Sequence, residues 1–234
     1  INFLVANSLK FLQGGFVPVT VGLILFTIMR TWGWGRKHWR ETLAKHAKMT
    51  IGEVLARKQR QKHSLERSLL LLTHEKQAMN KNDQAPALLQ LFINQYHLLP
   101  KHVICLNIHQ TRHPYIDDDD RYIIKEFENN HKKGVSFLTI TAQFGFMEAP
   151  NVEKVIQDIA DNENLTPNDD MKDWIIYVGR ERFADRKQKH PKRIVRLKGL
   201  LYSLLVNNST PSYEYYGLGD DKRLSAELVP VNLV

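Results

Sequence analysis

The sequence has 234 residues, of which 43% are hydrophobic and 25% are charged, as in an ordinary globular protein. Its net charge of +8 is concentrated in residues 30–67, where 11 Lys or Arg occur with 3 Asp or Glu. Residues 68–234 carry 21 basic and 22 acidic side chains, and this net charge of −1 argues against a nucleic-acid-binding domain. The single cysteine, Cys105, excludes an internal disulfide framework and is predicted to be a small core residue.

The first predicted element is a membrane-spanning helix. Residues Phe11–Met29 are 19 positions without a charge, bounded by Lys10 and Arg30, and at about 1.5 Å per residue they span roughly 30 Å of hydrocarbon. The buried core helix of a soluble protein also fits this run, but it does not explain the aromatic and basic residues that follow. Tryptophans expected at a membrane interface lie just beyond, at Trp32, Trp34 and Trp39. The sequence therefore predicts the end of a membrane domain over residues 1–35, with a helix over about residues 11–32.

The basic flank sets the predicted orientation. An excess of Lys and Arg marks the cytoplasmic side of a membrane helix, so residues after about 35 are expected in the cytoplasm. The apolar start at Ile1, with no signal-peptide pattern, indicates a fragment of a larger multi-pass protein of the cell membrane.

Residues 36–63 are predicted to form a basic, broken helical linker. Trp39, Leu43 and Ala47 recur every four residues, and Thr50 with Glu53 forms a capping-box pattern that begins a second helix. Such a stripe is compatible with contact to lipid headgroups or a partner subunit, or with a solvated connecting helix.

Residues 64–234 show strands alternating with helices, the pattern of an α/β domain with a mostly parallel sheet. The expected strands are Leu69–Thr73, Val103–Ile108, Tyr122–Phe127, Val135–Phe144 and Trp174–Val178. The expected helices are Pro86–Tyr96, one that begins after Asn151, and Ile194–Val206. The predicted core contains Leu71, Ile104, Leu106, Phe137, Ile140, Ile156, Ile175 and Tyr177.

Motifs for catalysis or metal binding are absent from the sequence, so we expect no enzyme and no cofactor. There is no phosphate-binding loop, nucleophile elbow or zinc spacing, and the acidic run Asp117–Asp120 is predicted to be a solvated turn. Gly179 is predicted to begin a turn after a strand. His109, Arg112 and Arg180 follow predicted strands, where ligands bind in open α/β sheets, although solvated loop charges show the same pattern.

Specific residue spacings resemble the Kup/HAK/KT potassium permeases along nearly the whole chain. Two segments of this chain resemble the family's entry into its last membrane helix and its exit from that helix. They are Asn7-x-x-Lys10-Phe11-Leu12-x-Gly14-Gly15-Phe16-x-Pro18 and Leu25-Phe26-x-x-Met29-x-Thr31-Trp32. The cytoplasmic part is similar at Pro114-Tyr115, Phe144-Gly145-Phe146, Glu148-x-Pro150-Asn151-Val152 and Arg196-Leu-Lys-Gly-Leu-Leu-Tyr202. The chain departs from the family at Glu66–Leu70 and in its C-terminal tail.

The resemblance implies the C-terminal part of a potassium importer that couples potassium to protons. It implies roughly twelve membrane helices in the whole protein, with the cation-binding residues in the earlier ones, so none is assigned here. Its expected partners are the bilayer, the rest of the permease and a second copy of the chain in a homodimer.

Kinship with importers that cyclic di-AMP inhibits implies a regulatory role for residues 64–234. We therefore predict a nucleotide site near His109, Arg112 and Arg180, with Tyr115 or Tyr177 offering an aromatic face. Two other classes of function remain open: a membrane-tethered α/β enzyme or binding domain unrelated to ion transport, and a membrane-anchored nucleic-acid binder, which the charge of residues 68–234 disfavours.

Overall fold

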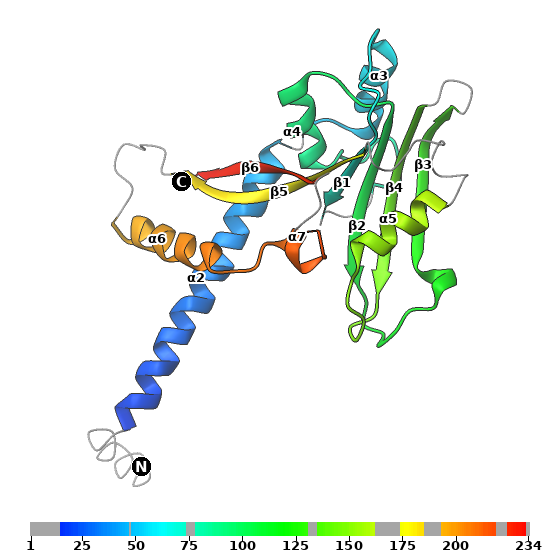
Figure 1. Cartoon of the computed structure of the whole chain (residues 1–234). Coiled ribbons are helices and arrows are strands. Elements are labelled where there is room, and N and C mark those ends of the chain that lie inside the picture. The colour runs from blue at the N-terminus through cyan, green and yellow to red at the C-terminus, as the bar shows by residue number, and fades with distance from the viewer. Residues whose placement is uncertain are drawn as a thin grey trace. The chain divides into compact units, whose positions relative to one another are not determined.

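A computed structural model describes residues 15–46, 48–73, 78–130, 135–161, 174–184, 193–218 and 224–232 (Figure 1). Its helices are α2 (Phe16–His46), α3 (Ile51–Arg60), α4 (Ala87–Tyr96), α5 (Val152–Asp161), α6 (Arg193–Asn207) and α7 (Ser212–Tyr215). Its strands are β1 (Leu69–Thr73), β2 (His102–Gln110), β3 (Tyr122–Asn130), β4 (Val135–Phe144), β5 (Ile175–Ala184) and β6 (Leu224–Asn232). A short 3-10 turn, η2, covers Asp118–Asp120, where the sequence predicts a solvated turn.

Helix α2 is the one helix in the described part of the chain that is long and apolar enough to cross a membrane. Its apolar side chains are not packed as those of a core helix would be. About half or more of the surface of each is exposed at Phe16, Val17, Val19, Leu23, Ile24, Leu25, Phe26 and Met29. An exposed apolar surface of this extent fits a lipid environment. The predicted first turns, before residue 15, lie outside the described residues.

A charge inside this apolar segment is expected to oppose membrane insertion. Replacing Leu23 by Arg should cost roughly 2–4 kcal/mol of insertion free energy, because the guanidinium would enter hydrocarbon. The measurement is the fraction of the 234-residue chain that resists alkaline extraction from membranes. Leu23→Val is the matched control and should remain inserted, whereas equal extraction of both variants would contradict a spanning role for α2.

The linker contains the predicted break and the predicted capping box. Helix α2 ends at His46, and α3 begins after Thr50, whose hydroxyl accepts a hydrogen bond from the Glu53 amide. The Glu53 carboxylate accepts one from the Thr50 amide at 2.8 Å, so two amides at the start of the helix are satisfied locally.

The sheet has six strands in the order β3-β4-β2-β1-β5-β6. Strands β4, β2, β1 and β5 are parallel, and the edge strand β3 pairs antiparallel with β4. The central strand β1 consists of four leucines and a threonine that are all buried, because it has a neighbour on each side and a covering layer on each face. The α/β domain is therefore the mostly parallel one that strand–helix alternation predicts.

The two faces of the sheet follow the two-residue period of the strands. On one face, α5 packs against alternate residues of four strands, in a core made of Leu70, Leu72, Ile104, Leu106, Leu138, Ile140, Ala142, Val152, Val155, Ile156, Ile159, Trp174, Ile176 and Val178. On the other face, Phe92 of α4 contacts the ring of Tyr177 edge to face at 5.3 Å between ring centroids.

Seven of the eight predicted core residues are buried, and Ile175 is only half-buried. Ile175 lies on the α4 face at the beginning of β5, whereas α4 covers the strand further along, at Tyr177 and Gly179. The turn predicted at Gly179 is wrong, because β5 continues through this residue to Ala184. A Cβ at position 179 would lie 2.8 Å from a methyl carbon of Leu88, so a glycine at this position allows α4 to pack closely against the sheet.

The chain divides into two compact units. One contains residues 1–41, 183–209 and 230–234, and the other contains residues 42–182 and 210–229. These units cut the chain at other positions than the predicted segments 1–35, 36–63 and 64–234. In particular, α6 groups with the N-terminal helix and α3 groups with the α/β domain.

Candidate functional site at the carboxyl edge of the sheet

Two loops meet at the carboxyl ends of the neighbouring strands β2 and β4. The Thr111 amide donates to the Phe144 carbonyl at 2.8 Å, and the Phe146 amide donates to the His113 carbonyl at 2.9 Å. The Met147 amide donates to the Pro114 carbonyl at 3.1 Å, which extends the pairing beyond the strands. A Cβ at position 145 would lie 2.1 Å from the Pro114 carbonyl oxygen, so only glycine permits this approach.

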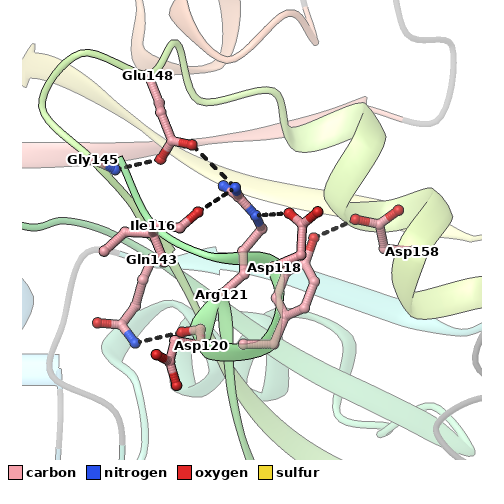
Figure 2. Close-up of polar contacts among 9 residues, drawn as sticks. Ile116, Asp118, Asp120, Arg121, Gln143, Gly145, Glu148 and Asp158 are labelled. Atoms are coloured by element: carbon pink, nitrogen blue, oxygen red, sulfur yellow. Dashed lines mark hydrogen bonds and ion pairs between the residues drawn. The ribbon is translucent and has the colours of Figure 1, made fainter. Parts of the chain in front are cut away.

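Arg121 lies between these loops and binds both of them, as Figure 2 shows. One terminal nitrogen donates to the Ile116 carbonyl at 2.9 Å and to the Glu148 carboxylate at 3.1 Å. Nε of the same guanidinium donates to Asp118 at 3.0 Å. The second oxygen of Glu148 accepts from the Gly145 amide at 2.6 Å. We call the group Gly145, Glu148, Arg121, Asp118 and Ile116 the loop clamp.

The charges of the loop clamp stabilise each other. The Gly145 amide and then the Arg121 guanidinium hold the pKa of Glu148 below its ordinary value of 4.5. The hydrogen bond to Glu148 is the main reason that the pKa of Arg121 is raised. The side chains of Arg121 and Glu148 are 13% and 18% exposed, so this pair is well shielded, whereas Asp118 is largely in solvent. Because Arg121 and Glu148 are engaged with each other, their geometry suits the positioning of loops rather than proton transfer.

A second contact joins the beginning of β3 to α5. The hydroxyl of Tyr122 donates to the carboxylate of Asp158 at 2.5 Å (Figure 2). Burial, together with this hydrogen bond, raises the pKa of the Tyr122 hydroxyl well above its usual range, so the donor proton is retained at neutral pH.

Acid is expected to weaken the loop clamp through Glu148. The pKa of Glu148 is lower in the folded state than in the unfolded state. Its contribution to stability is therefore complete at pH values above the unfolded-state pKa, and it is lost as the pH falls through the folded-state pKa. In urea unfolding of the detergent-solubilised chain from about pH 7 to pH 3, the E148Q variant should therefore lose less stability than the parent.

Asp83 provides a matched control for this acid dependence. The amides of Met79 and Asn80 lower its pKa in a separate turn, so D83N should remove its own share of the acid dependence and leave that of Glu148 intact. Parent and E148Q curves with the same slope in acid would contradict the assignment of the lowered pKa to the loop clamp.

The three predicted nucleotide-binding residues occupy different places. His109 lies within β2 and Arg180 within β5, although the sequence predicts loops there, and Arg112 lies in the loop after β2. All three are exposed.

The register shows which of them lie near each other. In β1, Thr73 pairs with Asn107 of β2 and Leu72 pairs with Val178 of β5. His109 and Arg180 therefore lie beyond the end of β1, on the strands β2 and β5, which are about 10 Å apart. His109 is on the α4 face, and Arg180, next to the α4-facing Gly179, is on the α5 face. The fold brings His109 to the same strand end as Arg112 but does not bring it to Arg180, and their binding role stays a prediction.

Sequence reasoning found two motifs of this edge but missed how they work. The Phe144-Gly145-Phe146 and Glu148-x-Pro150 motifs contain the glycine and the carboxylate of the loop clamp. Arg121 was missed, because its partner Glu148 is 27 residues away and no local spacing connects them. Among the described residues, no group of three His, Cys, Asp or Glu side chains could hold a metal ion.

Comparison with known proteins identifies the two parts of the chain. Residues 73–230 match the family pattern described as K+ potassium transporter C-terminal domain, and residues 1–37 match the K+ potassium transporter integral membrane domain. No solved structure matches the chain.

Several curated relatives align along most of the chain. A probable potassium transport system protein Kup 3 of Legionella pneumophila is 26% identical over 93% of this chain and 32% of its own length. Kup 1 of Syntrophobacter fumaroxidans is 29% identical over 93% of this chain and 30% of its own. Kup of Methylococcus capsulatus is 26% identical over 95% of this chain and 33% of its own. The chain thus spans about a third of the length of these relatives. Because the C-terminal-domain pattern alone covers more than half of it, the chain belongs to the K+ potassium transporter family.

Proposed function

We propose that this chain is the C-terminal portion of a proton-coupled potassium importer in the cell membrane. The observation that carries the proposal is the order of the two family regions in one chain, an integral membrane part over residues 1–37 followed by a C-terminal domain over residues 73–230. The exposed apolar part of helix α2, from Phe16 to Met29, lies in the first region, as a lipid-facing segment should. Potassium and protons are the proposed transported species, and their binding residues belong to other parts of the permease.

Potassium uptake is the direct test of this function. The permease that contains this chain is expressed in cells that lack their own uptake systems, and growth is followed at low external potassium and at several external pH values. We expect growth to be rescued and to improve with an inward proton gradient. Failure to grow despite correct membrane insertion would contradict potassium import. A growth rate that does not change with the proton gradient would contradict proton coupling.

We propose further that the residues after about 35 face the cytoplasm. The basic flank after Arg30 supports this orientation. Single cysteines at exposed positions of the α/β domain, such as Met147, should react with a membrane-impermeant reagent only after the cells are opened. Reaction in intact cells would overturn the orientation.

The α/β domain is proposed to serve regulation, with cyclic di-AMP as its ligand and a dimer as its working form. A dianionic cyclic dinucleotide needs cations for its phosphates and flat surfaces for its bases. Arg112 and Tyr115 are both exposed in the loop after β2, and Phe146 is exposed in the loop that pairs with it. A two-fold ligand also suits a two-fold interface, in which each subunit offers the same patch.

Calorimetric titration of the detergent-solubilised chain with cyclic di-AMP tests this proposal. We expect binding that weakens in R112A. R180A tests the third predicted residue by itself, because the fold separates it from His109, and the exposed Lys125 of β3 provides a control, K125A, that should bind as the parent does. No binding at high micromolar ligand would refute nucleotide sensing. Unchanged binding in both arginine variants would refute the assignment of Arg112 and Arg180 to the nucleotide site. Sedimentation of the chain with and without ligand measures the dimer.

A further inference from the structure

Helix α6 has two apolar faces, and only one of them is packed. Gly199 and Tyr202 are buried on the inner face. On the opposite side, Ile194, Leu197, Leu200 and Leu204 are 59–69% exposed. At 3.6 residues per turn these four side chains lie within about 120° of the helix circumference, so they form one continuous stripe. We call them the outer stripe.

The inner face places α6 against the membrane helix, within the same compact unit. The ring of Tyr202 lies 5.5 Å from that of Trp32, centroid to centroid. A Cβ at position 35 would lie 2.1 Å from the Tyr202 ring, so Gly35 provides the space in which that ring packs. Trp32 is three residues past Met29, about 5 Å further along the axis, which is the depth of lipid headgroups when Phe16–Met29 is in hydrocarbon.

The charges of α6 suit an anionic lipid surface. Arg193, Arg196 and Lys198 are exposed along the helix, and the sequence of residues 193–207 contains no Asp or Glu. On the helix circumference, Arg196 and Lys198 lie on either side of the outer stripe. An apolar stripe bordered by basic side chains is typical of helices that lie in a membrane interface, where long cationic side chains reach the headgroups.

We propose that α6 is an interfacial helix, whose outer stripe inserts into the anionic lipid surface on the side of the membrane where the basic end of α2 emerges. The proposal rests on the proposed function only in taking α2 as a membrane span. The apolar side chains enter the boundary between headgroups and acyl chains, and the three cations bind lipid phosphates. Residues 193–207 thereby give the chain a second membrane attachment, far from α2 in sequence.

The test measures the depth of α6 in a bilayer. Nitroxide labels are placed at Leu197 and Leu204 of the whole chain, in a Cys105→Ala background, and their accessibility to oxygen and to a water-soluble nickel chelate is compared. The chain is reconstituted in phosphatidylcholine nanodiscs with and without phosphatidylglycerol. We expect both labels to lie roughly 5–10 Å below the phosphates in the discs that contain phosphatidylglycerol. A shallower position is expected when Arg193, Arg196 and Lys198 are all replaced by Gln.

Two control labels separate the possible outcomes. Leu25 in the membrane helix should be accessible to oxygen, and Met147 of the α/β domain, which is exposed to a similar degree as the outer stripe, should be accessible to nickel. Labels on α6 that behave as Met147 does would overturn the proposal. Labels shielded from both reagents would also overturn it, because the occupant would then be protein, either a second copy or the rest of the permease. A nickel-accessible Leu25 would instead refute the membrane span itself.

Discussion

Replacing Gly145 by alanine is expected to lower the free energy of unfolding of the α/β domain by roughly 3 kcal/mol. The added Cβ would lie 2.1 Å from the Pro114 carbonyl oxygen and 2.6 Å from the Tyr115 amide nitrogen. These are backbone atoms, which cannot rotate away as the end of a flexible side chain can. The two loops must therefore separate, and the hydrogen bonds from the Phe146 amide to His113 and from the Gly145 amide to Glu148 are lengthened.

Urea unfolding of the detergent-solubilised chain, followed by circular dichroism, measures this loss. Gly33→Ala is the matched control, because a Cβ at that helical position meets nothing within 4 Å and alanine is the better helix former. Hydrogen exchange should in addition be faster at Phe146 and Met147 in G145A. An unchanged stability for G145A would show that the loops approach each other less closely than the loop clamp requires.

Replacing Ile140 by alanine is expected to cost roughly 4 kcal/mol, because the side chain is fully buried in the middle of the sheet. Its neighbour in β2 is Leu106, and both belong to the core that α5 covers. Removing three methyl or methylene carbons there loses their transfer free energy and leaves a cavity that a close-packed sheet fills poorly.

The cross-strand neighbour of Ile140 provides a matched control. Ile124 of the edge strand β3 pairs with it but is 38% exposed, so Ile124→Ala is expected to cost about 1 kcal/mol or less by urea unfolding. If the two variants lost the same stability, β4 would not be the buried strand of this pair.

Much of the fold could be predicted because its signals are local. The capping box of Thr50 and Glu53 lies within one turn of helix, and Asn151 caps α5 by accepting from the Lys154 amide three residues on. The predicted strand Val135–Phe144 has the bounds of β4, since an apolar run buried on both faces has no polar period to blur its ends.

The errors and omissions arise where the reason for a residue is distant in sequence. Gly179 looks like the start of a turn, but its role is to admit Leu88 of α4, which is 91 positions earlier. Arg121 looks like a solvated charge next to an acidic run, and only the meeting of two strand ends gives it Glu148 as a partner. Likewise, the opposite directions of His109 and Arg180 depend on strand parity and register, which spacing after a predicted strand does not supply.

The position of β1 in the middle of the sheet has a consequence for synthesis of the chain. β2, β3 and β4 can all assemble on one side of β1 as soon as Phe144 has left the ribosome, whereas its other neighbour, β5, begins about 30 residues later. At ribosomal rates this delay is roughly 2–6 s, much longer than the formation of secondary structure. During that interval the side of the leucine-rich strand β1 that faces away from β2 has no partner strand. The nascent domain is therefore most prone to wrong strand pairing in the time between the synthesis of β4 and that of β5. The arrival of Ile175–Val178 ends that exposure.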